Sequence, residues 1–135
     1  MAAVAKNGTP SIAGTLPNDS QKMGPFLAGE DIAAGDAVYL GASGMWFRSN
    51  GSASAAAAEV DGFAANAALT GQRQPLTAVH DTDMAYFVPG AQTPGTYLYL
   101  SATVPGGLDT ATNAAQANFK VRVLPDGRIR TARSY

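Results

Sequence analysis

The feature of this sequence that most constrains its fold is a succession of short runs of β-forming residues, each closed by a cluster of turn-forming residues. The last run is the clearest: apolar and basic side chains alternate from Phe119 to Val123, and Ile129 lies between two arginines. A period of two is typical of a strand with one buried face. Between these stretches lies the segment 125–127, Pro-Asp-Gly, in which proline presets φ and glycine accepts a positive φ. Residues 119–130 are therefore predicted to form a β-hairpin.

The same pattern recurs upstream. Candidate strands cover residues 37–40, 45–48, 74–80, 84–88 and 96–101. The turn cluster at 41–44 predicts a hairpin between the first two. Within the third, Leu76, Ala78 and His80 are expected on one face, with Thr77 and Val79 on the other.

Helix signals are weak by comparison. The alanine-rich runs 53–59 and 64–69 carry no amphipathic stripe of large side chains, so short turns or loops are expected there. Many short strands at regular spacing predict an all-β fold, a compact β-barrel or β-sandwich. Because much of the apolar content is alanine, a few larger residues are expected to form the core: Phe26, Leu27, Val38, Leu40, Trp46, Phe47, Phe63, Leu76, Val79, Phe87, Leu98, Leu100, Phe119, Val121, Val123 and Ile129.

The segment 1–24 differs from the rest of the chain. It mixes glycines and prolines with small polar residues and shows no sustained period. We interpret it as an extended N-terminal arm, followed by a β domain at 25–135. Either the arm orders against a neighbouring subunit, or it is a frayed terminus.

Charge is scarce and unevenly placed. Only 14% of the residues are charged, against about 25% in an average domain. A charge-poor surface suits a protein that buries much of its exterior against partners, although a low-charge monomer is the alternative. Residues 1–118 hold four basic and nine acidic residues, whereas residues 119–135 hold five basic residues and one acidic residue.

Several chemistries find no support in the sequence. Without cysteine the chain forms neither disulfides nor thiolate metal sites. Residues 1–8 lack the apolar region of a signal peptide and no run approaches 18 apolar residues, so no membrane association is expected. The only histidine, His80, precedes Asp81, and neighbours along a strand point to opposite faces, so the two are not expected to pair as a catalytic dyad. No enzymatic activity or cofactor is expected.

Metal and nucleic-acid binding are also disfavoured. Glu30, Asp31 and Asp36 form a small acidic group, but they lack the ligand ladder of a calcium loop. The C-terminal hairpin is basic, yet its one aromatic residue, Phe119, is in phase with the core, so no platform for stacking bases is expected.

Six segments in succession carry a family resemblance. They read AGEDIAAGDAVYL at 28–40, GFA at 62–64, GQ at 71–72, GTYLYLS at 95–101, PGGL at 105–108 and VLPDGRI at 123–129. This order resembles the capsid decoration proteins of tailed bacteriophages, also called cement or head-stabilisation proteins. The resemblance covers about residues 26–131.

The resemblance implies a tulip-like or clip-like β domain that forms homotrimers on the outside of the capsid. These trimers clamp the major capsid protein, so the expected location is the virion exterior, after synthesis in the cytoplasm of the bacterial host. The family has no catalytic residues. Two alternatives stay open: a tail or fibre module, and a β-clip domain that binds a sugar or another small ligand. A trimeric β-clip nucleotidase of the dUTPase kind lacks its glycine-rich phosphate motif here.

The candidate contact residues come from the charge pattern. If the hairpin register places Ile129 beside the valines, Lys120, Arg122, Arg128 and Arg130 share one outer face. That face is predicted to meet acidic groups, either on an acidic capsid surface or at Glu30, Asp31 or Asp36 of a neighbouring subunit. A merely solvated face is the alternative.

Overall fold

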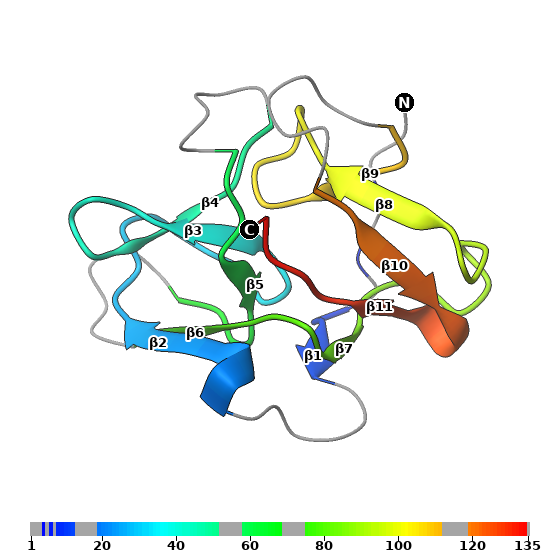
Figure 1. Cartoon of the computed structure of the whole chain (residues 1–135), viewed down its shortest axis with the longest axis horizontal. Coiled ribbons are helices and arrows are strands. Elements are labelled where there is room, and N and C mark those ends of the chain that lie inside the picture. Colours follow the sequence, from blue (N-terminus) through cyan, green and yellow to red (C-terminus); the bar gives the residue numbers. More distant parts are fainter. Residues whose placement is uncertain are drawn as a thin grey trace.

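The computed structural model describes residues 4, 6, 8–12, 19–51, 58–68, 75–111 and 119–134. It contains two antiparallel sheets, shown in Figure 1. The six-stranded sheet has the order β1 (Ser11–Ile12), β7 (Asp83–Ala85), β11 (Arg128–Arg130), β10 (Val121–Leu124), β8 (Tyr97–Leu100) and β9 (Leu108–Asp109). The five-stranded sheet has the order β2 (Lys22–Phe26), β6 (Leu76–Val79), β5 (Gly62–Ala64), β3 (Ala37–Leu40) and β4 (Trp46–Arg48).

The predicted all-β class is confirmed. The described residues contain no α-helix, and the only helical turns among them are the 3-10 turns η1 (Asp19–Gln21) and η2 (Pro125–Gly127). The two sheets pack as a sandwich and, over the part of the chain described, do not close into a barrel. Most of the alanine-rich run 53–59 and the motif at 71–72 lie outside the described residues.

The main core lies between the sheets. Phe63 of β5 stacks on Phe119, which precedes β10, with ring centroids 6.3 Å apart. A second core covers the opposite face of the five-stranded sheet, around the fully buried Trp46. Strand β6 shows both faces: Val79 lies in the main core and Ala78 in the second, as its predicted alternation requires. Strands β3, β5 and β6 of the five-stranded sheet therefore have buried residues on both faces.

Four of the predicted core residues are not fully buried. Leu40 and Phe47 are partly buried, whereas Phe26 is 38% exposed and Leu27 is 45% exposed, because β2 is an edge strand of its sheet and Leu27 directly follows it. Phe26 still packs against Trp46, with ring centroids 5.7 Å apart. An edge strand has a neighbour on one side only, and a local sequence pattern does not say which strand is at the edge.

Both predicted hairpins are confirmed. In β3–β4, Tyr39 lies opposite Phe47. In β10–β11, Val123 lies opposite Ile129, which puts Ile129 beside the valines as expected. The turn depends on Gly127, which has φ 75°. A Cβ on this residue would lie 2.1 Å from the carbonyl oxygen of Phe87, so only glycine fits here.

The structure differs from the predicted arm. Strand β2 crosses the boundary drawn after residue 24, and β1 pairs with β7 of the same chain. The backbone N–H of Val4 donates to the carbonyl of Leu108 at 2.9 Å, and Pro10 is buried. The described part of 1–24 therefore packs on its own domain, where the free edges of β6 and β7 provide the pairing. Residues 1–3, 5, 7 and 13–18 lie outside the described residues.

Candidate interaction surface

The outer face of β10 and β11 carries the predicted basic residues. Val121 and Val123 are each 1% exposed and point into the core, so Arg122 between them points outward. Arg122 lies directly opposite Arg130. We call Lys120, Arg122, Arg128 and Arg130 the basic face. The register confirms that Arg122, Arg128 and Arg130 share one side of the hairpin, and the contact of Lys120 with the ring of Tyr97 places it on the same side.

An aromatic residue joins this face from a distant part of the chain. Tyr97 of β8 lies opposite Arg122. Its ring centroid is 4.3 Å from Lys120 Nζ and 5.6 Å from Arg122 Cζ. Exposed contacts of a cation with a ring contribute about 0.5–1 kcal/mol each. The sequence analysis missed Tyr97, although its alternation with the buried Leu98 indicates that it points outward.

One carboxylate offsets part of the positive charge. Asp83 of β7 lies opposite Arg130, and its Oδ1 accepts a hydrogen bond from Arg130 Nε at 2.6 Å. It is the only described acidic residue ion-paired with the basic face. Lys120, Arg122 and Arg128 therefore keep positive charges that no described carboxylate neutralises.

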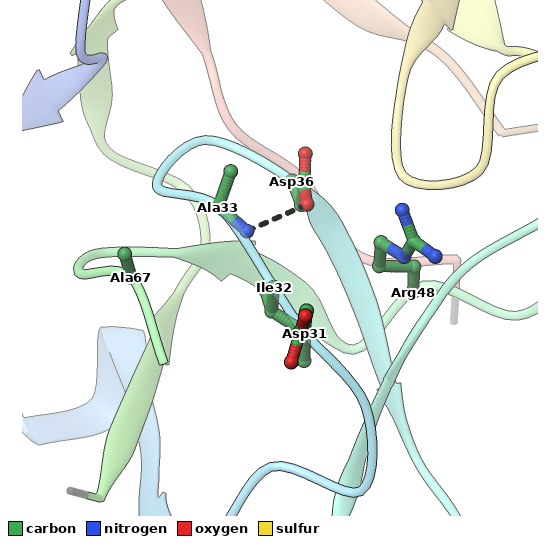
Figure 2. Close-up of a pocket in the computed structure, with 6 residues that line it drawn as sticks. All are labelled: Asp31, Ile32, Ala33, Asp36, Arg48 and Ala67. Atoms are coloured by element: carbon green, nitrogen blue, oxygen red, sulfur yellow. Dashed lines mark hydrogen bonds between the residues drawn. The ribbon is translucent and has the colours of Figure 1, made fainter. Parts of the chain in front are cut away.

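Asp36, predicted to contact a neighbouring subunit, is engaged within its own chain. It precedes β3, is 6% exposed and forms an ion pair with Lys6. Its Oδ2 accepts a hydrogen bond from the backbone N–H of Ala33 at 2.9 Å, the contact drawn in Figure 2. A Cβ on Gly106 would lie 2.9 Å from the Cβ of Asp36. Asp36 thus contacts the N-terminal segment, its own turn and the loop before β9.

Glu30 also has a partner in its own chain. Its Oε1 accepts from Arg48 Nη2 at 3.1 Å and Nε at 3.3 Å, and its Oε2 accepts from the Arg48 backbone N–H at 2.9 Å. Asp31 is exposed and lines a hollow of about 310 Å³ with Ile32, Ala67 and Arg48 (Figure 2). Asp31 and Asp36 thus line one hollow, and Glu30 is paired with Arg48, which also lines it.

This hollow offers little for a metal or a polar ligand. Its lining combines the aliphatic Ile32, Ala33 and Ala67 with the charged Asp31, Asp36 and Arg48, of which Asp36 and Arg48 are engaged with Lys6 and Glu30. Among the residues that the structure describes, no three His, Cys, Asp or Glu side chains lie close enough together to hold a metal ion.

The expectation that His80 and Asp81 point to opposite faces was wrong. His80 Nδ1 lies 2.6 Å from Asp81 Oδ2. Asp81 has φ 57°, a left-handed conformation that ends the strand alternation and brings both side chains to one side. The histidine side chain is 4% exposed, and no second side chain hydrogen-bonds it among the described residues, so the pair fixes the crossover from β6 to β7.

A buried hydroxyl also escaped the sequence analysis. Tyr86 is 1% exposed, and its Oη has no hydrogen-bond partner among the described residues. Burial raises the pKa of the Tyr86 hydroxyl well above its usual value, and the negative charge of Asp36 raises it further. The pattern of residues around it gives no signal of this, because the nearby charge comes from a segment fifty residues away.

The fold and the surface together define an all-β, two-sheet domain with one basic face. Over the described ranges, no helix is long and apolar enough to cross a membrane. Comparisons with protein-family models, curated proteins and solved structures give no match to this chain.

Proposed function

We propose that this protein is a structural component of a phage head, a capsid decoration protein. It binds the outer surface of the shell as a homotrimer and stabilises it against the pressure of packaged DNA. The function is one of binding, and the proposal assigns no catalysis, cofactor or nucleic-acid ligand to the chain.

The observation that carries the proposal is the ordered succession of the six segments that resemble this family. Five of them are described, and they contact one another in the fold. Strand β5, from 62–64, pairs with β3 of the long segment 28–40, and β8 pairs with β10. The backbone N–H of Ala37 donates to the carbonyl of Gly106 at 2.8 Å. The resemblance thus follows the framework of one domain and is not scattered over its loops.

The small-ligand alternative has less support. A binding pocket needs a few polar groups free to orient the ligand. In the hollow of Figure 2, the carboxylate of Asp36 and the guanidinium of Arg48 already have partners in the chain. Occupying them would require a ligand to displace an ion pair.

The test is binding to purified, expanded heads that lack decoration. The protein is mixed with the heads, and occupancy is measured by co-sedimentation and electron microscopy. We expect saturable binding at three-fold positions on the outside, and decorated heads that survive heating better than bare ones, because a ligand of the intact state stabilises it by mass action. Light scattering should give three times the 13.8 kDa of one chain. Binding to tails or fibres instead of heads would replace this proposal with the tail-module alternative.

A further inference from the structure

We propose that the basic face is a docking surface for acidic side chains of another protein. Within the proposed function, on which this inference rests, that protein is the one that forms the shell. The surface consists of Lys120, Arg122 and Arg128, with Tyr97 between the first two. Arg130 completes the face but already has Asp83 as a partner.

The basic face lowers the stability of the sheet that carries it. Arg122 and Arg130 lie directly opposite each other, and like charges in such pairs are destabilising. The chain as a whole has a net charge of −1 and nine acidic residues before residue 119. Only Asp83 among the described acidic residues is ion-paired with this face. A positive surface kept in an acidic protein, at the expense of sheet stability, fits a surface that meets negative charge elsewhere.

Tyr97 restrains the side chains of Lys120 and Arg122. Lys120 and Arg122 both lie over its ring, at 4.3 and 5.6 Å from the centroid. Long basic side chains lose conformational freedom when they bind, and a contact that restrains them beforehand reduces this loss. Tyr97 is therefore a positioning residue for the two cations.

Two observations favour carboxylates of a protein over nucleic acid. The ring of Tyr97 lies beneath two cations, so it is not an open platform on which a base stacks. The remainder of the chain is acidic, so a long phosphate backbone that extends beyond the basic face is repelled, whereas a single carboxylate contacts the basic face alone.

Acidic residues that a sister copy of this chain was predicted to offer are engaged in ion pairs of their own. Glu30 is paired with Arg48, Asp36 with Lys6, and Asp83 with Arg130. A second copy would have to break its own ion pairs to offer these groups. The predicted contact of the basic face with Glu30 or Asp36 of a neighbour is therefore not part of this proposal.

The first experiment measures affinity for expanded heads over a series of salt concentrations. We expect Arg122→Glu to weaken binding about tenfold at low salt and to flatten the salt dependence. The matched control is Lys22→Glu, the same charge change at an exposed position on β2 of the other sheet. It should leave affinity within about twofold of the wild type.

Three further variants separate docking from a structural role. Arg122→Thr should raise thermal stability and lower affinity, because it removes both the like-charge pair and a docking cation. Asp83→Asn should lower thermal stability and raise affinity, because it frees the charge of Arg130. Tyr97→Leu should weaken binding with no change in net charge, and Tyr97→Phe, which keeps the ring, should not.

The outcomes distinguish this inference from the proposed function. Heads that bind the wild type with no response to salt or to Arg122→Glu would overturn the docking surface and leave the decoration function intact. If heads do not bind the wild type, the decoration function fails. The surface is then judged by NMR titration with poly-L-glutamate and with a short DNA duplex. Shifts confined to β8, β10 and β11, at lower concentrations of polyglutamate than of DNA, would support it. Tighter binding of DNA, or no shifts on these strands, would overturn it.

Discussion

The ammonium group of Lys6 is ion-paired with the carboxylate of Asp36, thirty residues further along the chain. The pair ties the N-terminal segment to the start of β3, at a carboxylate that is 6% exposed. Because Asp36 also accepts the backbone N–H of Ala33, its removal affects two contacts at once.

Substitutions at this pair should destabilise the domain unequally. Asp36→Ala is expected to lower the free energy of unfolding by about 2–4 kcal/mol, because it leaves the Ala33 N–H without its acceptor and the Lys6 ammonium with only the Ala34 carbonyl. Lys6→Met should cost about 1–2 kcal/mol, since Lys6 is partly exposed and water replaces part of the contact. Urea denaturation measures both. An equal loss in the two variants would show that the Ala33 hydrogen bond contributes nothing.

Removal of the N-terminal segment should lower the stability of the domain. Deletion of residues 1–12 removes β1, Lys6 and the Val4 hydrogen bond to Leu108. The truncated chain is expected to unfold at a lower urea concentration than Lys6→Met, because it loses more contacts. A truncated domain as stable as the intact one would restore the hypothesis of an arm that serves only a neighbouring subunit.

The buried Tyr86 hydroxyl predicts a stabilising substitution. An unsatisfied buried hydroxyl costs about 1–3 kcal/mol, and phenylalanine has nearly the same shape without it. Tyr86→Phe should therefore raise the free energy of unfolding by about 1 kcal/mol. A loss of stability on this substitution would reveal a hydrogen-bond partner for the hydroxyl in solution.

The same hydroxyl predicts a difference at high pH. The folded state raises the pKa of Tyr86, so above the unfolded value of about 10 the unfolded chain releases a proton that the folded chain retains. The contribution of this pKa shift to the free energy of unfolding is fully present below pH 10 and declines by up to about 1.4 kcal/mol per pH unit above it. Unfolding measured from pH 8 to 11.5 should show this decline in the wild type and a shallower one in Tyr86→Phe. Parallel curves would contradict it.

Two glycines allow the cost of backbone strain to be separated from the cost of steric overlap. Gly44 and Gly127 both have positive φ, 82° and 75°. A Cβ on Gly44 meets nothing within 4 Å, whereas one on Gly127 overlaps the Phe87 carbonyl. Gly44→Ala should lose about 1 kcal/mol from backbone strain alone, and Gly127→Ala clearly more, through opening of the β10–β11 turn. Thermal denaturation compares the two, and similar losses would indicate that the turn adjusts to the added methyl group.

Local sequence patterns predicted the strands and hairpins, whereas the contacts between distant segments could not be predicted from them. Alternation from Phe119 to Ile129 predicted both the hairpin and the common side of its basic residues, because a period of two fixes which way each side chain points. The same logic failed at Asp81, where a non-glycine residue with positive φ ends the alternation. Tyr97 was missed because only the pairing of β8 with β10 brings it to Arg122.

The N-terminal segment shows the same limit. Its glycines and prolines indicate an irregular chain, yet they do not say which chain it packs on. That depends on the free edge of β7 and on the buried carboxylate of Asp36, both of which are supplied by residues far along the sequence.

Burial of β3, β5 and β6 on both faces has an evolutionary consequence. A residue at almost any position of β3, β5 or β6 is held by one core or the other, so selection for folding governs these strands. The outward positions of β8, β10 and β11 carry no such constraint. Mutations there can retarget the molecule to a new surface while the buried positions of β3, β5 and β6 are preserved.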